Sequence, residues 1–216
     1  MTFLEAVNDV LARLRENTVA TFNQSSYSSM IAAFVNDAKN RVEDAWEWDA
    51  QSTTLTITTT PGVTNYVLTG AGTKHKNETV NITTVGKQAR LTRKSMSWIQ
   101  DQQQLTTTST SAPIYYAWNG SNGTDSKVEL FATPDAAYTI AFNLNVPQLK
   151  LTDNADVIIV PGEVVVLGAY ARALAERGED GALMSSEAYG LYQSNLSDRI
   201  AIEQTRNEDY AVWEAT

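Results

Sequence analysis

Residues 138–174 read YTIAFNLNVPQLKLTDNADVIIVPGEVVVLGAYARAL, and the spacing of their apolar side chains changes part-way along. From Tyr138 to Val146 the even-numbered residues are apolar, which is typical of a β-strand with one buried face. After Pro161, apolar residues recur at helical intervals as far as Leu174, which is typical of a helix with one buried face. Proline suits the first turn of a helix because the amide donor that it lacks has no partner there. The chain therefore passes from a sheet to a helix within this stretch.

The N-terminal part of the sequence, residues 1–50, also has helical spacing. Thr2 and Glu5 match a capping box, in which the hydroxyl accepts from a free amide and the carboxylate reaches back. Ser25 or Ser26 is suited to cap a second helix. The two apolar stripes consist of Leu4, Val7, Leu11 and Leu14, and of Ile31, Phe34, Val35, Ala38, Val42 and Ala45.

The middle of the chain, about residues 52–147, is rich in threonine and is punctuated by turn-forming residues. Its short apolar segments predict β-strands at Thr54–Thr58, Tyr66–Leu68, Val80–Ile82, Ala89–Thr92, Pro113–Trp118, Lys127–Ala132 and Tyr138–Val146. Many short strands separated by turns favour a small sandwich or barrel. Gln102–Ser111 is polar and low in complexity, and we predict an exposed loop there.

The last part of the chain, residues 151–216, returns to helical spacing, with a break at Gly178–Gly181 and a long helix after it. Helices at both ends and strands between them predict the α+β class. We expect one helical bundle built from residues 1–50 and 151–216. An antiparallel β sandwich or barrel, residues 51–150, is predicted as an insertion into it.

The charge of the 216-residue chain is −9 at pH 7, and it is unevenly distributed. Residues 1–50 carry −4, residues 51–150 carry +3 and residues 151–216 carry −8. Tight binding to nucleic acid depends on cations that neutralise phosphates, so acidic segments do not grip DNA. Acidic walls would instead leave a passing polyanion mobile.

Several classes of site are excluded or disfavoured by residue content. The chain has no cysteine, which excludes disulfides and thiolate chemistry, and one histidine, which excludes multi-histidine zinc sites. No glycine loop of the Walker type and no nucleophile elbow occurs. We predict that His75 is a solvated loop residue and that Asp153–Asp156 is a plain turn before a helix. The sequence therefore predicts no enzyme, no cofactor and no metal site.

The hydropathy pattern also bears on location. No apolar run reaches the roughly 18 residues that a membrane-spanning helix requires. The start of the sequence, MTFLEAVNDV, lacks the basic region of a signal peptide. We therefore expect neither a membrane span nor export.

Six basic residues fall close together between positions 74 and 94, opposed only by Glu78. They are Lys74, Lys76, Lys87, Arg90, Arg93 and Lys94. One interpretation is a patch that faces phosphates or a partner. The other is the solvated face of a threonine-rich hairpin, where lysine also discourages edge pairing. Their spacing does not keep a period of two, so not all six can face the same way.

Two aromatic residues, Tyr210 and Trp213, lie in an otherwise acidic and polar segment. An isolated apolar anchor in a polar segment commonly docks on a partner. We consider Tyr210 and Trp213 candidate partner-docking residues. The alternative is that they dock on the helical bundle of their own chain.

Two stretches of the helical regions carry a resemblance. Residues 34–48 read FVNDAKNRVEDAWEW, and residues 167–181 read LGAYARALAERGEDG, followed by SEAY at 186–189. The first resembles the N-terminal helix, and the second the later helix pair, of the head-to-tail adaptors of tailed bacteriophages, the tail tubular protein A-like group. The order of helices, strands and helices is similar too.

This resemblance implies a structural protein of the virion. Such adaptors form a dodecameric ring of identical copies under the portal protein and present a platform to the tail nozzle or tail tube protein. Genomic DNA passes through the ring without specific binding. The expected location is the head–tail interface of the virion, after assembly in the host cytoplasm, which the absence of cysteine suits.

Two other functions remain as alternatives. The β region would be a carbohydrate- or receptor-binding module if Trp98 or Trp118 were exposed to stack on sugar rings. A hydrolase would require carboxylates brought together in a pocket by folding.

Overall fold

The computed structural model describes residues 1–105, 110–178 and 183–206. Contacts within the chain divide it into two compact units. The helical unit comprises Met1–Ala50 and Gln148–Thr216, and the β unit comprises Gln51–Pro147. Segments from both ends of the sequence thus fold together, and the β unit interrupts them.

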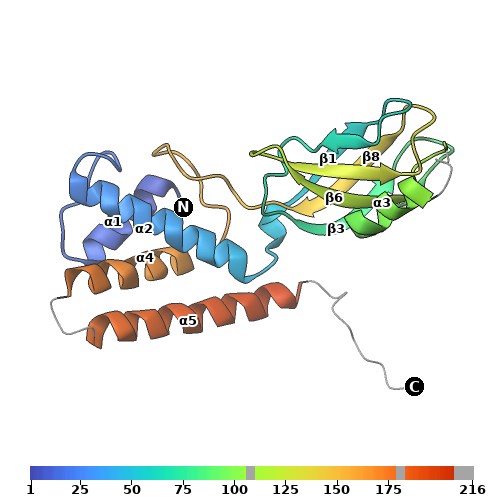
Figure 1. Ribbon diagram of the computed structural model, residues 1–216. Helices are drawn as coiled ribbons and strands as arrows, with labels where there is room; N and C mark the ends of the chain where they lie inside the picture. The colour runs from blue at the N-terminus through green and yellow to red at the C-terminus, as the bar shows by residue number, and fades with distance from the viewer. Residues whose placement is uncertain (106–109, 179–182, 207–216) are drawn as a thin grey trace, which may run out of the picture. The chain divides into compact units, whose positions relative to one another are not determined.

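The helical unit contains four long helices, and α4 lies among the other three (Figure 1). Their bounds are α1 Phe3–Arg13, α2 Ser26–Ala45, α4 Gly162–Arg177 and α5 Leu183–Gln204, and the short 3-10 helix η1 spans Asp49–Gln51. Helix α4 packs against α1, α2 and α5, and α1 also packs against α2. A continuous apolar core joins the four helices, with Phe3, Ile31 and Val165 each at most 1% exposed.

The helix ends follow the predicted caps. Thr2 Oγ1 accepts from the Glu5 amide at 3.2 Å, and Glu5 Oε2 accepts from the Thr2 amide at 2.8 Å. Ser25 caps α2, and its partner in a second capping box is Ser28. Gly178 ends α4 in the left-handed conformation, with φ of +61°, which glycine adopts without a Cβ penalty.

The β unit consists of two four-stranded sheets, in the orders β1-β8-β3-β4 and β2-β7-β6-β5. The strands are β1 Ser52–Thr58, β2 Asn65–Val67, β3 Lys76–Ile82, β4 Ala89–Arg90, β5 Thr92–Arg93, β6 Tyr115–Ser121, β7 Ser126–Phe131 and β8 Thr139–Asn145. All pairs are antiparallel except β5 with β6, which is parallel.

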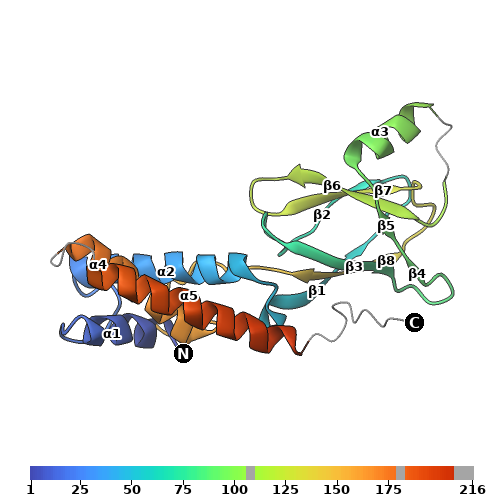
Figure 2. The same ribbon diagram turned by 90° about the horizontal axis from the view of Figure 1, so that it is seen from below.

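The two sheets lie over one another as separate layers (Figure 2). The alternation predicted for β8 is real: Ile140, Phe142 and Leu144 are fully buried and face the other sheet. Tyr116 on β6 and Leu130 on β7 complete the core from the opposite layer. The α+β prediction is confirmed, and the β unit is a sandwich of two sheets and not a closed barrel.

Two local predictions were wrong. Ala89–Thr92 is not one strand, because the chain crosses from one sheet to the other at Leu91, which is 3% exposed in the core. The predicted loop at Gln102–Ser111 begins as helix, since α3 spans Met96–Leu105. Trp98 anchors α3 on the sheet, with its ring centroid 5.0 Å from that of Tyr115. This packing outweighs the low hydropathy of the glutamine run.

Candidate functional site

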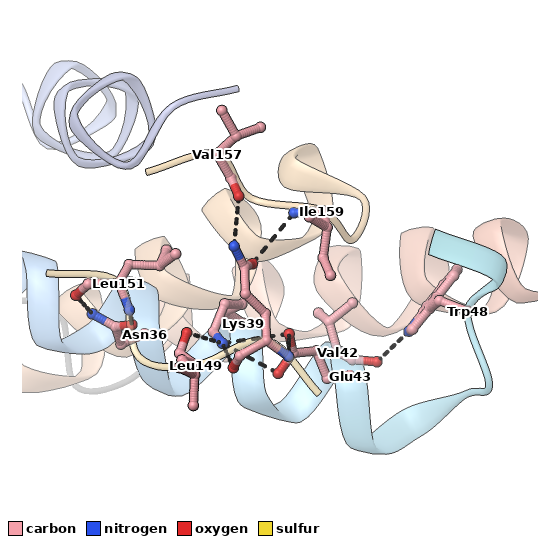
Figure 3. A network of polar contacts seen from close by, with 10 residues as sticks. Asn36, Lys39, Val42, Glu43, Trp48, Leu149, Leu151, Val157 and Ile159 are labelled. Atoms are coloured by element: carbon pink, nitrogen blue, oxygen red, sulfur yellow. Dashed lines mark hydrogen bonds and ion pairs between the residues drawn. The ribbon is translucent and has the colours of Figure 1, made fainter. Parts of the chain in front are cut away.

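A buried ion pair lies on α2 at the place where the chain re-enters the helical unit (Figure 3). Lys39 and Glu43 are one helical turn apart, and their side chains are 0% and 1% exposed. Lys39 Nζ lies 3.3 Å from Glu43 Oε2 and donates to the carbonyl oxygens of Gln148, at 2.6 Å, and Leu149, at 3.1 Å. The Gln148 amide donates to Glu43 Oε1 at 3.1 Å. The pair therefore holds the backbone of residues 148–149 against α2.

The same return segment is held at two further points. Asn36 accepts from the Leu151 amide at 2.9 Å and donates to the Leu151 carbonyl at 3.2 Å. The Gln148 side chain donates to the Val157 carbonyl at 2.7 Å. Each backbone group would otherwise lose its partner, and unpaired buried polar groups are costly. The network fixes the path of residues 148–157 over α2.

The electrostatics of this network indicate a structural role and not a catalytic one. Burial raises the pKa of the Glu43 carboxyl, and the Lys39 ammonium opposes that rise. A catalytic role would require an open cavity beside the pair, but both side chains are closed to solvent. Sequence reasoning missed this network, although the Lys–Glu spacing of four residues on a predicted helix was a signal.

A groove of about 470 Å³ runs between α2, α4 and α5. It is lined by small residues, including Gly168, Ala171 and Ala175, and by the rings of Phe34, Tyr189 and Tyr192. Arg41 and Arg172 line it as well, and the Arg172 guanidinium lies 5.8 Å from the centre of the Phe34 ring. Burial raises the pKa of the Tyr192 phenol, and the charge of Arg41 opposes that rise. The groove thus combines small and aromatic side chains with two exposed arginines.

Helix α5 also exposes an apolar stripe away from the core. Met184 is 54%, Leu191 53% and Ile202 48% exposed. Intervals of seven and eleven residues place these three side chains on one side of an α-helix. Asn195 and Asp198 lie between Leu191 and Ile202 on the same side, so this surface is partly apolar, and large exposed apolar side chains are typical of a protein interface.

The predicted basic cluster is divided among four places in the β unit. Lys76 and Arg93 line one shallow depression, and Lys94 lies over the rings of Trp98 and Tyr115 at 5.4 and 5.2 Å. Lys87 and Arg90 are exposed in and beside the turn that joins β3 to β4, and Lys74 is exposed before β3. The structure therefore brings Lys76 and Arg93 to one depression and places the others outside its lining.

His75 lies in a loop, as predicted, but it is half-buried and not solvated. Its ring lies 4.2 Å from that of Trp118, and its Nδ1 lies 3.3 Å from Ser126 Oγ. Burial lowers the pKa of His75, as does the charge of Arg93, while a hydrogen bond with the Gly72 backbone opposes them. His75 is thus a half-buried packing residue, which its lysine neighbours in sequence did not indicate.

The two tryptophans considered for sugar binding already have aromatic neighbours. Trp98 meets Tyr115 and Phe131 edge-on, and Trp118 is flanked by His75 and by Phe142, whose centroid lies 6.1 Å away. Both indoles are half-buried.

The remaining predicted features lie partly outside the described residues. Tyr210 and Trp213 lie outside the described residues. Within the described ranges, no group of three or more histidine or acidic side chains is placed to hold a metal ion. In the same ranges, no helix is both long and apolar enough to cross a bilayer. Asp153–Asp156 forms a turn, as predicted, in which Asp156 Oδ2 accepts from the amides of Thr152 and Asp153.

The family model described as SU10 adaptor protein matches residues 1–214. The chain belongs to the SU10 adaptor protein family. This is a family of structural bacteriophage adaptors and not of enzymes, so the chain is a phage adaptor and a virion component. No curated protein matches the chain significantly. The general resemblance to phage adaptors is confirmed, whereas the narrower one to the tail tubular protein A-like group stays a prediction.

Proposed function

We propose that this SU10 adaptor joins the head to the tail of the virion by forming a ring between the portal protein and the tail nozzle or tail tube protein. The observation that carries the proposal is the family match over residues 1–214, which spans both the helical and the β unit. We propose twelve copies per ring, with genomic DNA passing through the centre of the ring.

The charge distribution supports a role beside moving DNA. The two sequence regions that build the helical unit carry −4 and −8, and the middle region carries +3. Acidic surfaces repel phosphates and leave DNA free to slide, because affinity for DNA depends on neutralised phosphates. A helical unit that lines a DNA channel is consistent with that requirement.

The exposed stripe on α5 supports contact between neighbouring copies. Met184, Leu191 and Ile202 are each about half exposed, and burying such side chains between copies would stabilise a ring. We assign this stripe to the copy-to-copy contact. For Tyr210 and Trp213, docking on the portal and docking on their own chain are alternatives, and removal of residues 205–216 should weaken portal binding only if the first is right.

Electron microscopy of purified virions, and of the protein mixed with its portal, tests the proposal. We expect twelve-fold rings that contain this chain at the head–tail junction. Leu191→Lys should prevent ring formation, since it places a charge in the apolar contact. Ser197→Lys is the matched control, because Ser197 is exposed on the same helix about 120° away from the stripe. A chain that stays monomeric with the portal and is missing from virions would refute the proposal.

No observation favours a carbohydrate- or receptor-binding function over the adaptor. The rings of Trp98 and Trp118 pack against other aromatic side chains, so each has less free surface for a sugar. That alternative stays a prediction, for which a glycan-binding assay is the test.

A further inference from the structure

The groove between α2, α4 and α5 carries two arginines, Arg41 and Arg172. Within the described residues, Arg41 and Arg172 form no ion pair. Three other arginines of the helical unit do, since Arg177 pairs with Glu16, Arg199 with Glu163 and Arg206 with Glu203. Among the residues that the structure describes, Asp37 is the only carboxylate that lines the groove. An acidic occupant would complete this surface.

The side chains that line the groove suit an aromatic occupant. The rings of Phe34 and Tyr189 line the groove together with the small residues Ala171 and Ala175. Aromatic side chains bind well in such places, because they bury a large area and make edge-on contacts with neighbouring rings. The ligand that fits is therefore an acidic peptide with one or two aromatic side chains.

The chain itself contains such a peptide. Residues 207–216 read NEDYAVWEAT, with Glu208, Asp209 and Glu214 around Tyr210 and Trp213. We propose that this segment docks in the groove of its own chain, with Trp213 against the aromatic walls and the carboxylates beside Arg41 and Arg172. The proposal concerns the single chain and does not depend on ring assembly.

The segment is long enough to reach the groove. Tyr192 lies twelve residues before Gln204 on α5, which corresponds to about 18 Å along the helix axis. The nine residues from Gln204 to Trp213 span up to about 31 Å when extended. A tether of this length gives a local concentration in the millimolar range, which favours the segment of the same chain over that of another.

A second depression, of about 340 Å³, lies closer to the end of α5 but suits the segment less well. It is lined by Asp49, Glu163 and Glu203, and its two arginines are already paired with the two glutamates. An acidic segment would be repelled there. The cationic groove is therefore the better acceptor.

Disulfide trapping in the full-length chain tests the proposal directly, because the natural sequence has no cysteine. Val212→Cys is combined with Asp37→Cys, at an exposed position in the groove close to the level of Tyr192, or with Asp9→Cys, at an exposed position on α1. After mild oxidation, peptide mass spectrometry and non-reducing gels measure disulfides within and between chains. We expect the Asp37→Cys pair to close within one chain at least tenfold faster than the Asp9→Cys pair. Equal rates, or disulfides mainly between two chains, would overturn the proposal.

A second comparison separates specific docking from chance encounter. In the trapping pair, Arg41→Glu with Arg172→Glu, or Trp213→Ala, should each slow closure about tenfold. Arg13→Glu with Arg90→Glu is the matched control, since both arginines are exposed and lie outside the groove lining. Far-ultraviolet circular dichroism checks that each variant folds. Closure that is equally fast in all variants would also overturn the proposal, whatever the outcome of the ring experiment.

Discussion

Removing Lys39 should destabilise the helical unit more than any other single lysine substitution there. Lys39→Met keeps most of the side-chain volume but leaves the Glu43 carboxylate buried, with the Gln148 amide as its remaining donor. It also takes the donor away from the carbonyls of Gln148 and Leu149. Breaking a buried ion pair from one side typically costs about 3–5 kcal/mol. We expect a loss in that range at pH 7.

Urea unfolding followed by circular dichroism at 222 nm measures this loss. With a slope of about 2 kcal/mol per molar urea, the midpoint should fall by roughly 2 M. Lys150→Met is the matched control, because Lys150 is exposed beside the same network, and it should change stability by less than about 0.5 kcal/mol. The double variant Lys39→Met with Glu43→Leu should recover part of the loss, since it removes the unpaired charge as well.

The pH dependence supplies an independent check on the cause. Burial already raises the pKa of Glu43 above its ordinary value of 4.5, and loss of the Lys39 charge should raise it further. A raised carboxyl pKa means that the folded chain binds a proton more readily than the unfolded chain. The cost of Lys39→Met should therefore be full above the folded-state pKa of Glu43 and shrink as pH falls towards 4.5. A loss below about 1 kcal/mol at pH 7, or a double variant weaker than the single one, would refute this reasoning.

Three further predictions concern packing, acid stability and the β unit. Gly168→Ala should destabilise by about 1–3 kcal/mol in thermal unfolding, because its Cβ would lie 3.0 Å from the Tyr192 ring, whereas Gly190→Ala, with open space around it, should stabilise by about 0.5–1 kcal/mol. Backbone hydrogen bonds from Asp153 and Thr152 lower the pKa of the Asp156 carboxyl. The stability that the ionised carboxylate contributes is therefore present above its ordinary pKa of 3.8 and is lost as the pH falls below that value, so Asp156→Asn should flatten the fall in melting temperature between pH 5 and 2.5. Glu129→Met should lower the free energy of unfolding by about 1–3 kcal/mol, because the buried carboxylate accepts hydrogen bonds from Thr64 at 2.6 Å and from Asn65 at 2.7 Å. Tryptophan fluorescence during unfolding measures this, and an unchanged midpoint would show that the two donors bind water instead.

The sequence predicted the parts of the fold that depend on local periodicity. The capping box at Thr2 and the alternation along β8 are each specified by residues close together in the sequence, and both were predicted correctly. The crossing at Leu91 was not, because two-residue strands carry no period to detect. Helix α3 was missed because its stability comes from Trp98 packing on a strand more than ten residues later.

The candidate site, too, could be predicted only where it depends on residues close together in the sequence. Lys39 and Glu43 are visible as a pair on a helix, but only the fold shows that residues 148–149 cover them and turn a surface pair into a buried one. The groove has no sequence signature at all, since its arginines come from α2 and α4, 131 residues apart. An adaptor works through surfaces that several helices build jointly. Its functional residues are therefore recognised by which charges remain unpaired after folding, as Arg41 and Arg172 do among the described residues, and not by any motif.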